Sequence, residues 1–310
     1  MRIIFMGTPE FAVASLARLL DAEKDIVAVV TAPDKPAGRG QKLKTPAVKV
    51  FAEKHRIPVL QPLNLKAPEF LEVLSSYKAD LQVVVAFRML PEVVWNMPRL
   101  GTVNLHGSLL PQYRGAAPIH HAIIQGEQQT GVTTFLLQHA IDTGHILLQE
   151  KVAIGPDTTT GELHDTLMRV GARILLQTVE AIETGQYTPV PQDSIETGPL
   201  KPAPKLIKEE TRIDWHQPLD KVYNFIRGLS PFPCAFTTLE GTPLKIYRAE
   251  KEVSGEMKQS PGSVSTDGKT YLRFATPNGY IRVKQVQLQG KKAMLIEDFL
   301  RGYRWQQALS

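Results

Sequence analysis

Short apolar runs rich in β-branched residues alternate with segments of helical periodicity over the first 150 residues of this 310-residue chain. A buried parallel strand is almost wholly apolar, and the return to the next parallel strand usually needs a helix. The alternation is therefore typical of βαβ units and predicts an α/β domain with a Rossmann-like, mainly parallel sheet. The predicted strands are Ile3 to Met6, Ile26 to Thr31, Leu81 to Ala86 and Thr102 to Leu105.

The turn after the first predicted strand argues against a dinucleotide-binding site, which is a common function of such a sheet. It reads Gly7-Thr8-Pro9, followed by Glu10, and its polar residue, proline and acidic residue suit the start of a helix. It lacks the three spaced glycines of the dinucleotide-binding pattern GxGxxG. A dehydrogenase is therefore disfavoured.

Two further strands and a long helix are predicted after the parallel strands. Gly131 to Gln138 and His145 to Ile154 are joined by a short connection, which predicts an antiparallel pair. Thr159 and Glu162 form a capping-box pattern ahead of a helical repeat of apolar residues, and Gly185 is expected to end that helix.

The sequence changes character near residue 189. Five prolines fall between Pro189 and Pro204, which predicts an extended linker. An amphipathic helix and several short strands separated by glycine turns follow, which favours a small antiparallel β-barrel of the OB-like type. We therefore divide the chain into a first domain (1–189), a linker (190–205) and an OB-like domain (206–310).

The cysteine content indicates the cellular compartment, and the charge distribution indicates which part of the chain can attract negatively charged partners. Cys234 is the only cysteine, so neither an internal disulfide nor a cysteine-based zinc site can form, which fits a reducing cytoplasm. The apolar run at the N-terminus is too short for a signal peptide or a membrane span. Residues 1–205 carry equal numbers of positive and negative side chains, so the net charge of +5 lies in the C-terminal third.

One basic segment stands out in the otherwise balanced first part. From Lys35 to Arg56 the chain carries seven positive residues and one negative residue, Glu53. Such a patch attracts polyanions. Its charge alone fits a solvated surface loop equally well.

Two polar side chains lie at the carboxyl end of the fourth predicted parallel strand. Asn104 and His106 alternate with an apolar residue, so both point to one face at the carboxyl end of the strand, where open α/β sheets bind their ligands. The ordinary alternative is that they satisfy backbone groups, but Gly107 permits close approach of a ligand. Asp142 lies in the turn between the antiparallel strands, where an Asx turn would also explain it.

These residues and their neighbours resemble, in order and spacing, the signature of the folate-dependent formyltransferases: Asn104, His106, Ser108-Leu109-Leu110-Pro111, Arg114-Gly115-Ala116-Ala117-Pro118 and Asp142-Thr143-Gly144. Other segments extend the resemblance across the chain, to the branch of that family that acts on methionyl-tRNA: Gly7-Thr8-Pro9-Glu10-Phe11, Pro33 to Gly40, Arg212-Ile213-Asp214-Trp215 and Gly290-Lys291-Lys292-Ala293.

The resemblance implies an enzyme that moves the formyl group of 10-formyltetrahydrofolate to the amino group of methionine on initiator tRNA, in support of translation initiation. Its catalytic residues would be Asn104, His106 and Asp142. Formyl transfer builds negative charge on the formyl oxygen, which a neutral donor and an imidazole can stabilise. We favour His106 as the group that polarises this oxygen, with Asp142 keeping it charged. The alternative is that Asp142 accepts the amine proton through water.

The same resemblance assigns residues to the two substrates. The folate pocket would include Ser108, Leu109, Leu110 and Pro111, with Phe87 and Met89 on the pterin side. The segment from Phe87 to Pro91 departs from the family pattern, because it is one residue shorter and lacks a glycine. The tRNA would contact Arg39 first, together with Lys35, Lys42 and Lys44 of the basic segment. Lys205 and Lys291 of the OB-like domain are candidates chosen for their charge and expected position, and the contacts would be mainly to phosphates.

No bound metal is expected, because the adjacent His120 and His121 face different directions on a predicted helix, and His139 and His145 lack the His-x-x-x-His spacing. We expect a monomer. A formyltransferase acting on a small-molecule amine is the main alternative, although such an enzyme has no need of a basic second domain. Two others are the hydrolase domain of a formyltetrahydrofolate dehydrogenase and a catalytically silent tRNA-binding protein.

Overall fold

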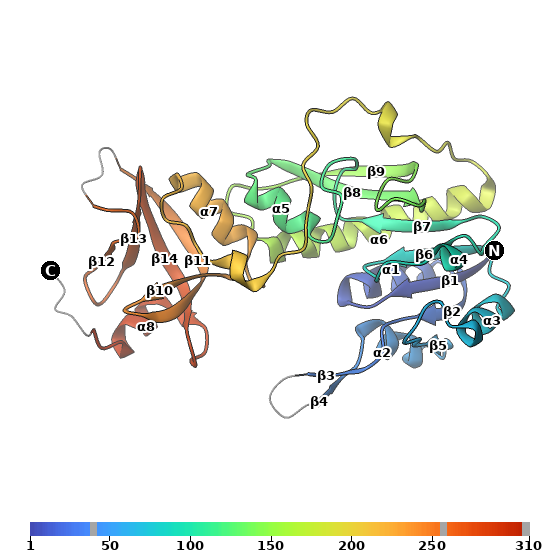
Figure 1. Ribbon diagram of the computed structural model, residues 1–310, viewed down its shortest axis with the longest axis horizontal. Coiled ribbons are helices and arrows are strands. Elements are labelled where there is room, and N and C mark those ends of the chain that lie inside the picture. Colours follow the sequence, from blue (N-terminus) through green and yellow to red (C-terminus); the bar gives the residue numbers. More distant parts are fainter. Residues whose placement is uncertain (38–41, 255–258, 306–310) are drawn as a thin grey trace. The chain divides into compact units, whose positions relative to one another are not determined.

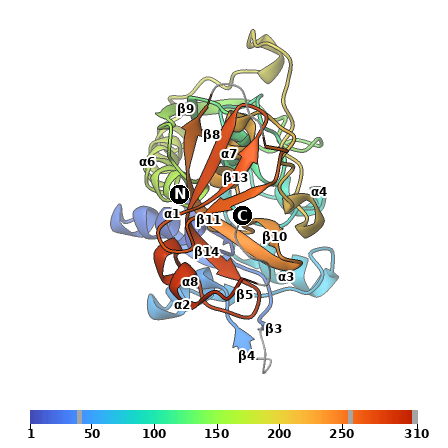
Figure 2. The ribbon, with the colours of Figure 1, turned by 90° about the vertical axis from the view of Figure 1, so that its left-hand side faces the viewer.

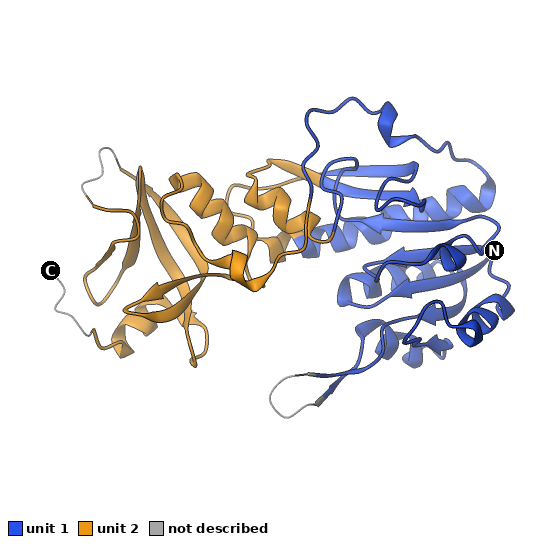
Figure 3. Ribbon diagram, viewed as in Figure 1, with its two compact units in different colours: residues 1–115, 131–152, 164–202 blue, residues 116–130, 153–163, 203–310 orange. Residues whose placement is uncertain are grey.

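The computed structural model describes residues 1–37, 42–254 and 259–305. The chain forms two compact units, each made of three stretches (Figure 3). Unit 1 contains residues 1–115, 131–152 and 164–202, and unit 2 contains residues 116–130, 153–163 and 203–310. The functional boundaries expected at residues 189 and 206 stay a prediction.

A seven-stranded sheet forms the centre of unit 1, in the order β5-β2-β1-β6-β7-β8-β9 (Figure 1). The strands from β5 to β7 pair in parallel and β8 pairs antiparallel with β7. The predicted Rossmann-like, mainly parallel sheet is therefore confirmed. The strands are β1 (Arg2–Gly7), β2 (Asp25–Val30), β5 (Val59–Leu60), β6 (Leu81–Val85), β7 (Thr102–His106), β8 (Gln129–Leu136) and β9 (Ile146–Ala153).

Helices cover both faces of this sheet. Ile4 and Met6 of β1 pack with Phe70 and Leu74 of α3 (Pro68–Ser76) in one apolar cluster, which also includes Val94 of α4 (Glu92–Trp95). The alternate residues of β1 point to the opposite face. On that face lie α1 (Glu10–Asp21) and α6 (Thr160–Thr184), and α2 (Ala47–Lys54) packs against α1.

Both ends of α6 follow the signals in the sequence. The Thr159 backbone N–H donates to Glu162 Oε2 over 2.8 Å, and the Glu162 N–H donates to Thr159 Oγ1 over 3.4 Å. The predicted capping box is thus confirmed. At the other end Gly185 has φ +69°, and the N–H of Gln186 donates to the Ala181 carbonyl over 2.9 Å, a bond typical of a glycine C-cap.

The basic segment contains a hairpin rather than a plain loop. β3 (Lys35–Ala37) pairs antiparallel with β4 (Lys42–Lys44), and the connection between them lies outside the described residues. At its base Lys49 donates to Asp34 over 2.8 Å, and this bond lowers the pKa of the Asp34 carboxyl. The hairpin escaped prediction because its short strands lack a clear apolar alternation.

The proline-rich stretch after α6 is attached to unit 1. Val190 exchanges two backbone hydrogen bonds of 2.8 Å with Ile146 of β9, and the turn Gln192–Ser194 (η1) follows. The Lys201 carbonyl also accepts a bond from the N–H of Tyr113 over 2.7 Å. Up to residue 202 this segment therefore packs with the sheet unit.

Unit 2 is built on an antiparallel sheet in the order β10-β11-β14-β13-β12, with β15 beside β14. Figure 2 shows β10, β11, β14 and β13 of this sheet. Its core is apolar and includes Trp215 stacked on Phe274 at 4.6 Å between ring centroids. The predicted OB-like antiparallel domain is confirmed as a half-barrel of these strands. They are β10 (Ala235–Leu239), β11 (Thr242–Val253), β12 (Val264–Thr266), β13 (Leu272–Thr276), β14 (Gly279–Leu288) and β15 (Met294–Leu295).

Among the described residues of this unit, three α-helices accompany the sheet. α7 (Leu219–Gly228) was predicted from its amphipathic pattern and packs against α5 (Pro118–Ile124), with Gly228 lying against Ile124. The turn Lys208–Thr211 (η2) and α8 (Ile296–Gly302) complete the unit. Across the described ranges, no helix combines the length and the apolar character that crossing a membrane requires.

Candidate functional site

The carboxyl end of β7 presents two polar side chains to one face of the sheet. Asn104 pairs in register with Val84 of β6 and Phe135 of β8, and His106 lies two residues further on. His106 is only 7% exposed, whereas Asn104 is half-buried. Within the described residues the Asn104 carboxamide makes no hydrogen bond, so its N–H groups are available to a ligand.

The imidazole of His106 is fixed by one hydrogen bond. Its Nε2 lies 2.9 Å from the carbonyl oxygen of Tyr113. A carbonyl only accepts, so Nε2 carries a hydrogen and the bond sets the tautomer. In the neutral ring Nδ1 is therefore the unprotonated nitrogen, and it is the nitrogen that gains or loses a proton.

Asp142 faces this free nitrogen. Its Oδ2 lies 3.8 Å from His106 Nδ1 and accepts the backbone N–H of Gly115 over 2.9 Å. The Asp142 carboxylate therefore does not form the Asx turn considered above, because its hydrogen bond comes from Gly115, in a loop distant in sequence. The structure brings Asp142 to His106, as the resemblance implied.

Three non-glycine residues in the left-handed backbone region lie in the segments that make this site. They are Ala86 after β6 (φ +48°), Tyr113 (φ +60°) and Asp142 (φ +54°). Such conformations cost free energy and concentrate where function needs a particular geometry. Two of the three, Tyr113 and Asp142, are the residues whose carbonyl and carboxylate face the imidazole.

Two side chains that sequence reasoning did not single out complete the arrangement. Arg114 donates to the side-chain oxygen of Gln192, and the amide nitrogen of Gln192 donates into the turn that carries Asp142. No local pattern marks Gln192, which lies among prolines and polar residues. Arg114 belongs to the resemblance but had no assigned role.

The predicted folate residues after β7 form a buried turn. Ser108, Leu110 and Pro111 are buried and Leu109 is half-buried. Thr133 Oγ1 donates to the Ser108 carbonyl over 2.7 Å and accepts the N–H of Leu110 over 3.1 Å. These residues therefore shape the edge of the site and expose little side-chain surface.

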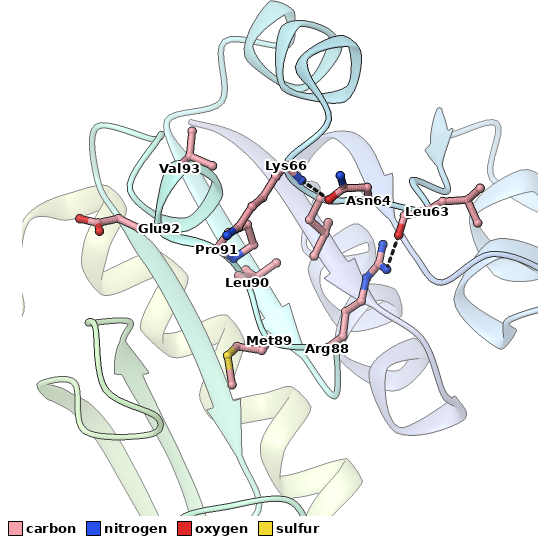
Figure 4. Close-up of a pocket in the computed structure, with 10 residues that line it drawn as sticks. Leu63, Asn64, Lys66, Arg88, Met89, Leu90, Pro91, Glu92 and Val93 are labelled. Carbon is pink, nitrogen blue, oxygen red and sulfur yellow. Dashed lines mark hydrogen bonds between the residues drawn. The ribbon is translucent and has the colours of Figure 1, made fainter.

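An open pocket of about 990 Å³ adjoins the segment after β6 (Figure 4). Met89 lines it and is 73% exposed, and Leu63 opposite is 84% exposed. Arg88 donates to the carbonyl oxygens of Leu63, over 3.1 Å, and Pro62. The lining residues are Leu63, Asn64, Leu65, Lys66, Arg88, Met89, Leu90, Pro91, Glu92 and Val93.

Phe87, the other residue predicted on the pterin side, does not line this pocket. It is half-buried against the apolar cluster of β1, β6 and α3, and the Arg88 guanidinium lies 5.6 Å from its ring centre. The shortened segment thus places an arginine where the family pattern has a glycine, and this arginine anchors the neighbouring loop.

The predicted tRNA residues are divided between the two units. Lys35 and Lys44 are exposed on the hairpin, and Lys42 belongs to β4. Arg39 lies outside the described residues. Lys205 and Lys291 are exposed in unit 2.

Comparison with known proteins defines the class. Residues 1–179 match the formyl transferase family and residues 205–304 match the formyl transferase C-terminal domain. The chain therefore belongs to the formyl transferase family. The methionyl-tRNA formyltransferase of Bacteroides fragilis is 50% identical over 314 residues, which cover 99% of this chain and 97% of that protein.

Solved structures share the fold at lower sequence identity. HypX from Aquifex aeolicus, in complex with tetrahydrofolic acid, matches with a TM-score of 0.66 and 19% identity over 97% of this chain. This chain spans 48% of HypX, about half its length. WlaRD, a sugar 3N-formyl transferase, matches with a TM-score of 0.67 and 18% identity, covering 94% of this chain and 99% of that chain. At these identities the likeness shows the fold alone.

Proposed function

We propose that this protein transfers the formyl group of 10-formyltetrahydrofolate to the free amino group of methionine carried by initiator tRNA. The observation that carries the proposal is the pairing of His106, with Nε2 bonded to Tyr113, and Asp142, with Oδ2 3.8 Å from Nδ1. Identity of 50% over almost the whole length of a methionyl-tRNA formyltransferase supports this acceptor.

Asn104 and His106 supply stabilisation where negative charge develops. When the amine adds to the formyl carbon, the carbonyl bond opens and its electron pair moves to the oxygen. The free N–H of Asn104 and the Nδ1–H of a protonated His106 are the donors that meet this oxygen. Donors held in place before the reaction, in a site with little water, are an effective source of rate enhancement.

Asp142 handles the proton that the reaction moves. The amine loses one proton as the new carbon–nitrogen bond forms, and the folate nitrogen gains one as the old bond breaks. The Asp142 carboxylate accepts the first proton, directly or through water, and the same proton then passes to the folate nitrogen, so the transfer balances. Its Oδ2 is held by the Gly115 N–H, which keeps the carboxylate in place through the transfer.

The pocket beside Met89 fits the folate. Apolar side chains of unusual exposure suit the flat rings of that molecule, and Arg88 and Lys66 suit its carboxylates. Residues 88–91 follow β6 and residues 108–111 follow β7, so neighbouring parallel strands carry both segments to one edge of the sheet. Residues 108–111 would border the reacting end of the co-substrate.

Positive side chains in both parts of the chain suit tRNA. We propose that Lys35, Lys42 and Lys44 contact phosphates of the acceptor arm together with Arg39, and that Lys205 and Lys291 contact the backbone elsewhere. Residues 1–189 would then carry catalysis, and residues 206–310 would bind tRNA. A cytoplasmic location and a monomeric state belong to the same proposal.

Alanine variants of the three proposed catalytic residues test this function. Asn104→Ala, His106→Ala and Asp142→Ala should each lower turnover by about 10²- to 10⁴-fold, while binding of tRNA stays near that of the wild type. Single-turnover assays with radiolabelled methionyl-tRNA separate the chemical step from binding. Full activity of Asp142→Ala would remove Asp142 from the mechanism.

A further inference from the structure

Gln192 occupies an unusual position for a residue of a proline-rich stretch. Its side chain is 3% exposed, and all four of its hydrogen-bonding positions are used. Oε1 accepts from Arg114 Nε and Nη2 over 3.0 and 2.6 Å, and Nε2 donates to the carbonyl oxygens of Asp142 and Gly144 over 2.8 Å each. A guanidinium only donates and carbonyls only accept, so these partners fix the orientation of the amide.

These bonds join the two segments that hold the Asp142 carboxylate. One is the turn that carries Asp142, whose left-handed backbone is clamped on both sides by the Gln192 amide nitrogen. The other is the loop in which Arg114 precedes Gly115, whose N–H binds Asp142 Oδ2. Gln192 thus sets the distance between the carboxylate and the backbone N–H that receives it.

The segment that carries Gln192 is anchored without the side chain. The paired backbone bonds between Val190 and Ile146 hold it on β9, and Gln112 accepts the N–H of Lys201 over 2.9 Å further along. Removal of the amide therefore leaves the segment attached and frees only the Asp142 turn and the Arg114 loop.

We propose that Gln192 is a positioning residue that holds Asp142 at the distance from His106 that formyl transfer needs. The inference rests on the catalytic role proposed for Asp142. A carboxylate that shifts by about 1 Å costs on the order of 10²-fold in rate when it acts in the transition state. Substrate contacts made elsewhere stay intact, so the loss should fall on kcat and leave the KM values for folate and tRNA within about twofold of the wild type.

Two substitutions separate positioning from simple attachment. Gln192→Ala removes all four bonds, and Gln192→Glu keeps an acceptor for Arg114 but places an oxygen against two carbonyls. Both variants should lose about 10- to 100-fold in kcat. If Gln192 merely tied down Arg114, Gln192→Glu would retain wild-type kcat, and that result overturns the proposal.

A matched control shows what loss of a buried glutamine does by itself. Gln82 is 1% exposed, accepts from Thr102 Oγ1 over 3.1 Å, and lies at the amino end of β6, opposite the end that leads to the site. Gln82→Ala should lower the thermal midpoint at least as much as Gln192→Ala and leave kcat unchanged. An equal loss of kcat in both variants means that general destabilisation explains the effect, which overturns the positioning role.

A double-mutant cycle with Asp142→Asn completes the test. If Gln192 acts through Asp142, adding Gln192→Ala to Asp142→Asn lowers kcat by less than about twofold, whereas independent effects multiply. Multiplying losses contradict the proposal. If Asp142→Asn is inactive and Gln192→Ala is fully active, only the role of Gln192 is refuted. If Asp142→Asn is fully active, the catalytic assignment of Asp142 and this inference are both refuted.

Discussion

His106 Nε2 and the carbonyl oxygen of Tyr113 lie 2.9 Å apart, and this bond decides which imidazole nitrogen is free for chemistry. The carbonyl requires a hydrogen on Nε2 in both the neutral and the cationic ring. Nδ1, which faces Asp142, is therefore the nitrogen whose protonation changes.

Two substitutions of His106 distinguish its nitrogens. A glutamine places its amide nitrogen near the position of Nε2 and preserves the bond to Tyr113, whereas an asparagine places a polar atom near Nδ1. We expect His106→Gln to fold with near wild-type stability and to lose about 10²- to 10⁴-fold in kcat. His106→Asn should retain more activity than His106→Gln in the same assay. The reverse order would mean that Nε2 is the functional nitrogen.

The basic hairpin should control the use of tRNA without affecting the use of folate. Replacing Lys35 and Lys44 together with glutamine should raise the KM for methionyl-tRNA and reduce the slope of its dependence on log salt by about 2, roughly one unit for each phosphate that no longer meets a lysine. The KM for 10-formyltetrahydrofolate should not change. Lys151→Gln, on the edge strand β9 at the far side of the sheet from β5, is the control. An unchanged salt slope in the double variant would exclude the hairpin from the tRNA site.

Arg88 should affect the folate pocket through the loop that it anchors. The guanidinium donates to the carbonyls of Pro62 and Leu63, and a lysine cannot reproduce this forked geometry. Arg88→Lys should therefore raise the KM for 10-formyltetrahydrofolate by about tenfold, because the charged hydrogen bonds that hold the loop are broken. Arg99→Lys, an exposed arginine that pairs with Asp80, is the control. Equal folate KM values in Arg88→Lys and the wild type would separate this loop from folate binding.

The ion pair at the start of α6 predicts a defined dependence of stability on acid. Arg248 Nη2 lies 2.7 Å from Glu162 Oε1, and this bond, together with the Thr159 N–H, lowers the pKa of Glu162 from 4.5 to about 2. A carboxyl whose pKa is lower in the folded than in the unfolded state stabilises the folded protein at pH values above the unfolded-state pKa. That contribution is lost as pH falls from 4.5 towards 2. Both side chains are about half exposed, so the contribution is on the order of 1 kcal/mol or less.

Thermal unfolding followed by circular dichroism between pH 5 and about pH 2 measures this effect. Arg248→Gln should be less stable than the wild type near pH 5, and the difference should narrow as the solution is acidified. Arg169→Gln removes an exposed arginine from α6, the helix that carries Glu162, and its stability should follow the wild-type curve. A constant difference for Arg248→Gln down to about pH 2 would contradict the assigned cause.

Local sequence patterns predicted the elements that carry the site because each pattern has a local physical cause. Alternation along β7 placed Asn104 and His106 on one face, and the capping box marked the start of α6. The approach of Asp142 to His106 came only from the family resemblance. Its cause is a bond to Gly115 and a backbone clamp from Gln192, 50 residues further along the chain, which no periodicity records.

The segment around Gln192 shows what composition leaves out. Prolines and few apolar residues predict an extended linker, whereas Gln192–Ser194 form a 3-10 turn and Val190 pairs with Ile146. Extended backbone can still be anchored by hydrogen bonds to a strand edge, as Val190 is to Ile146. The pattern carries no information about these hydrogen-bond partners.

Formylation of two acceptors by the same purified protein tests the proposed function most directly. One reaction contains 10-formyltetrahydrofolate and charged initiator methionyl-tRNA, and the other contains the same donor and a nucleotide-linked amino sugar. The proposal predicts that kcat/KM for methionyl-tRNA exceeds that for the amino sugar by at least about 10²-fold. Efficient formylation of the sugar amine with no formylation of methionyl-tRNA would contradict it.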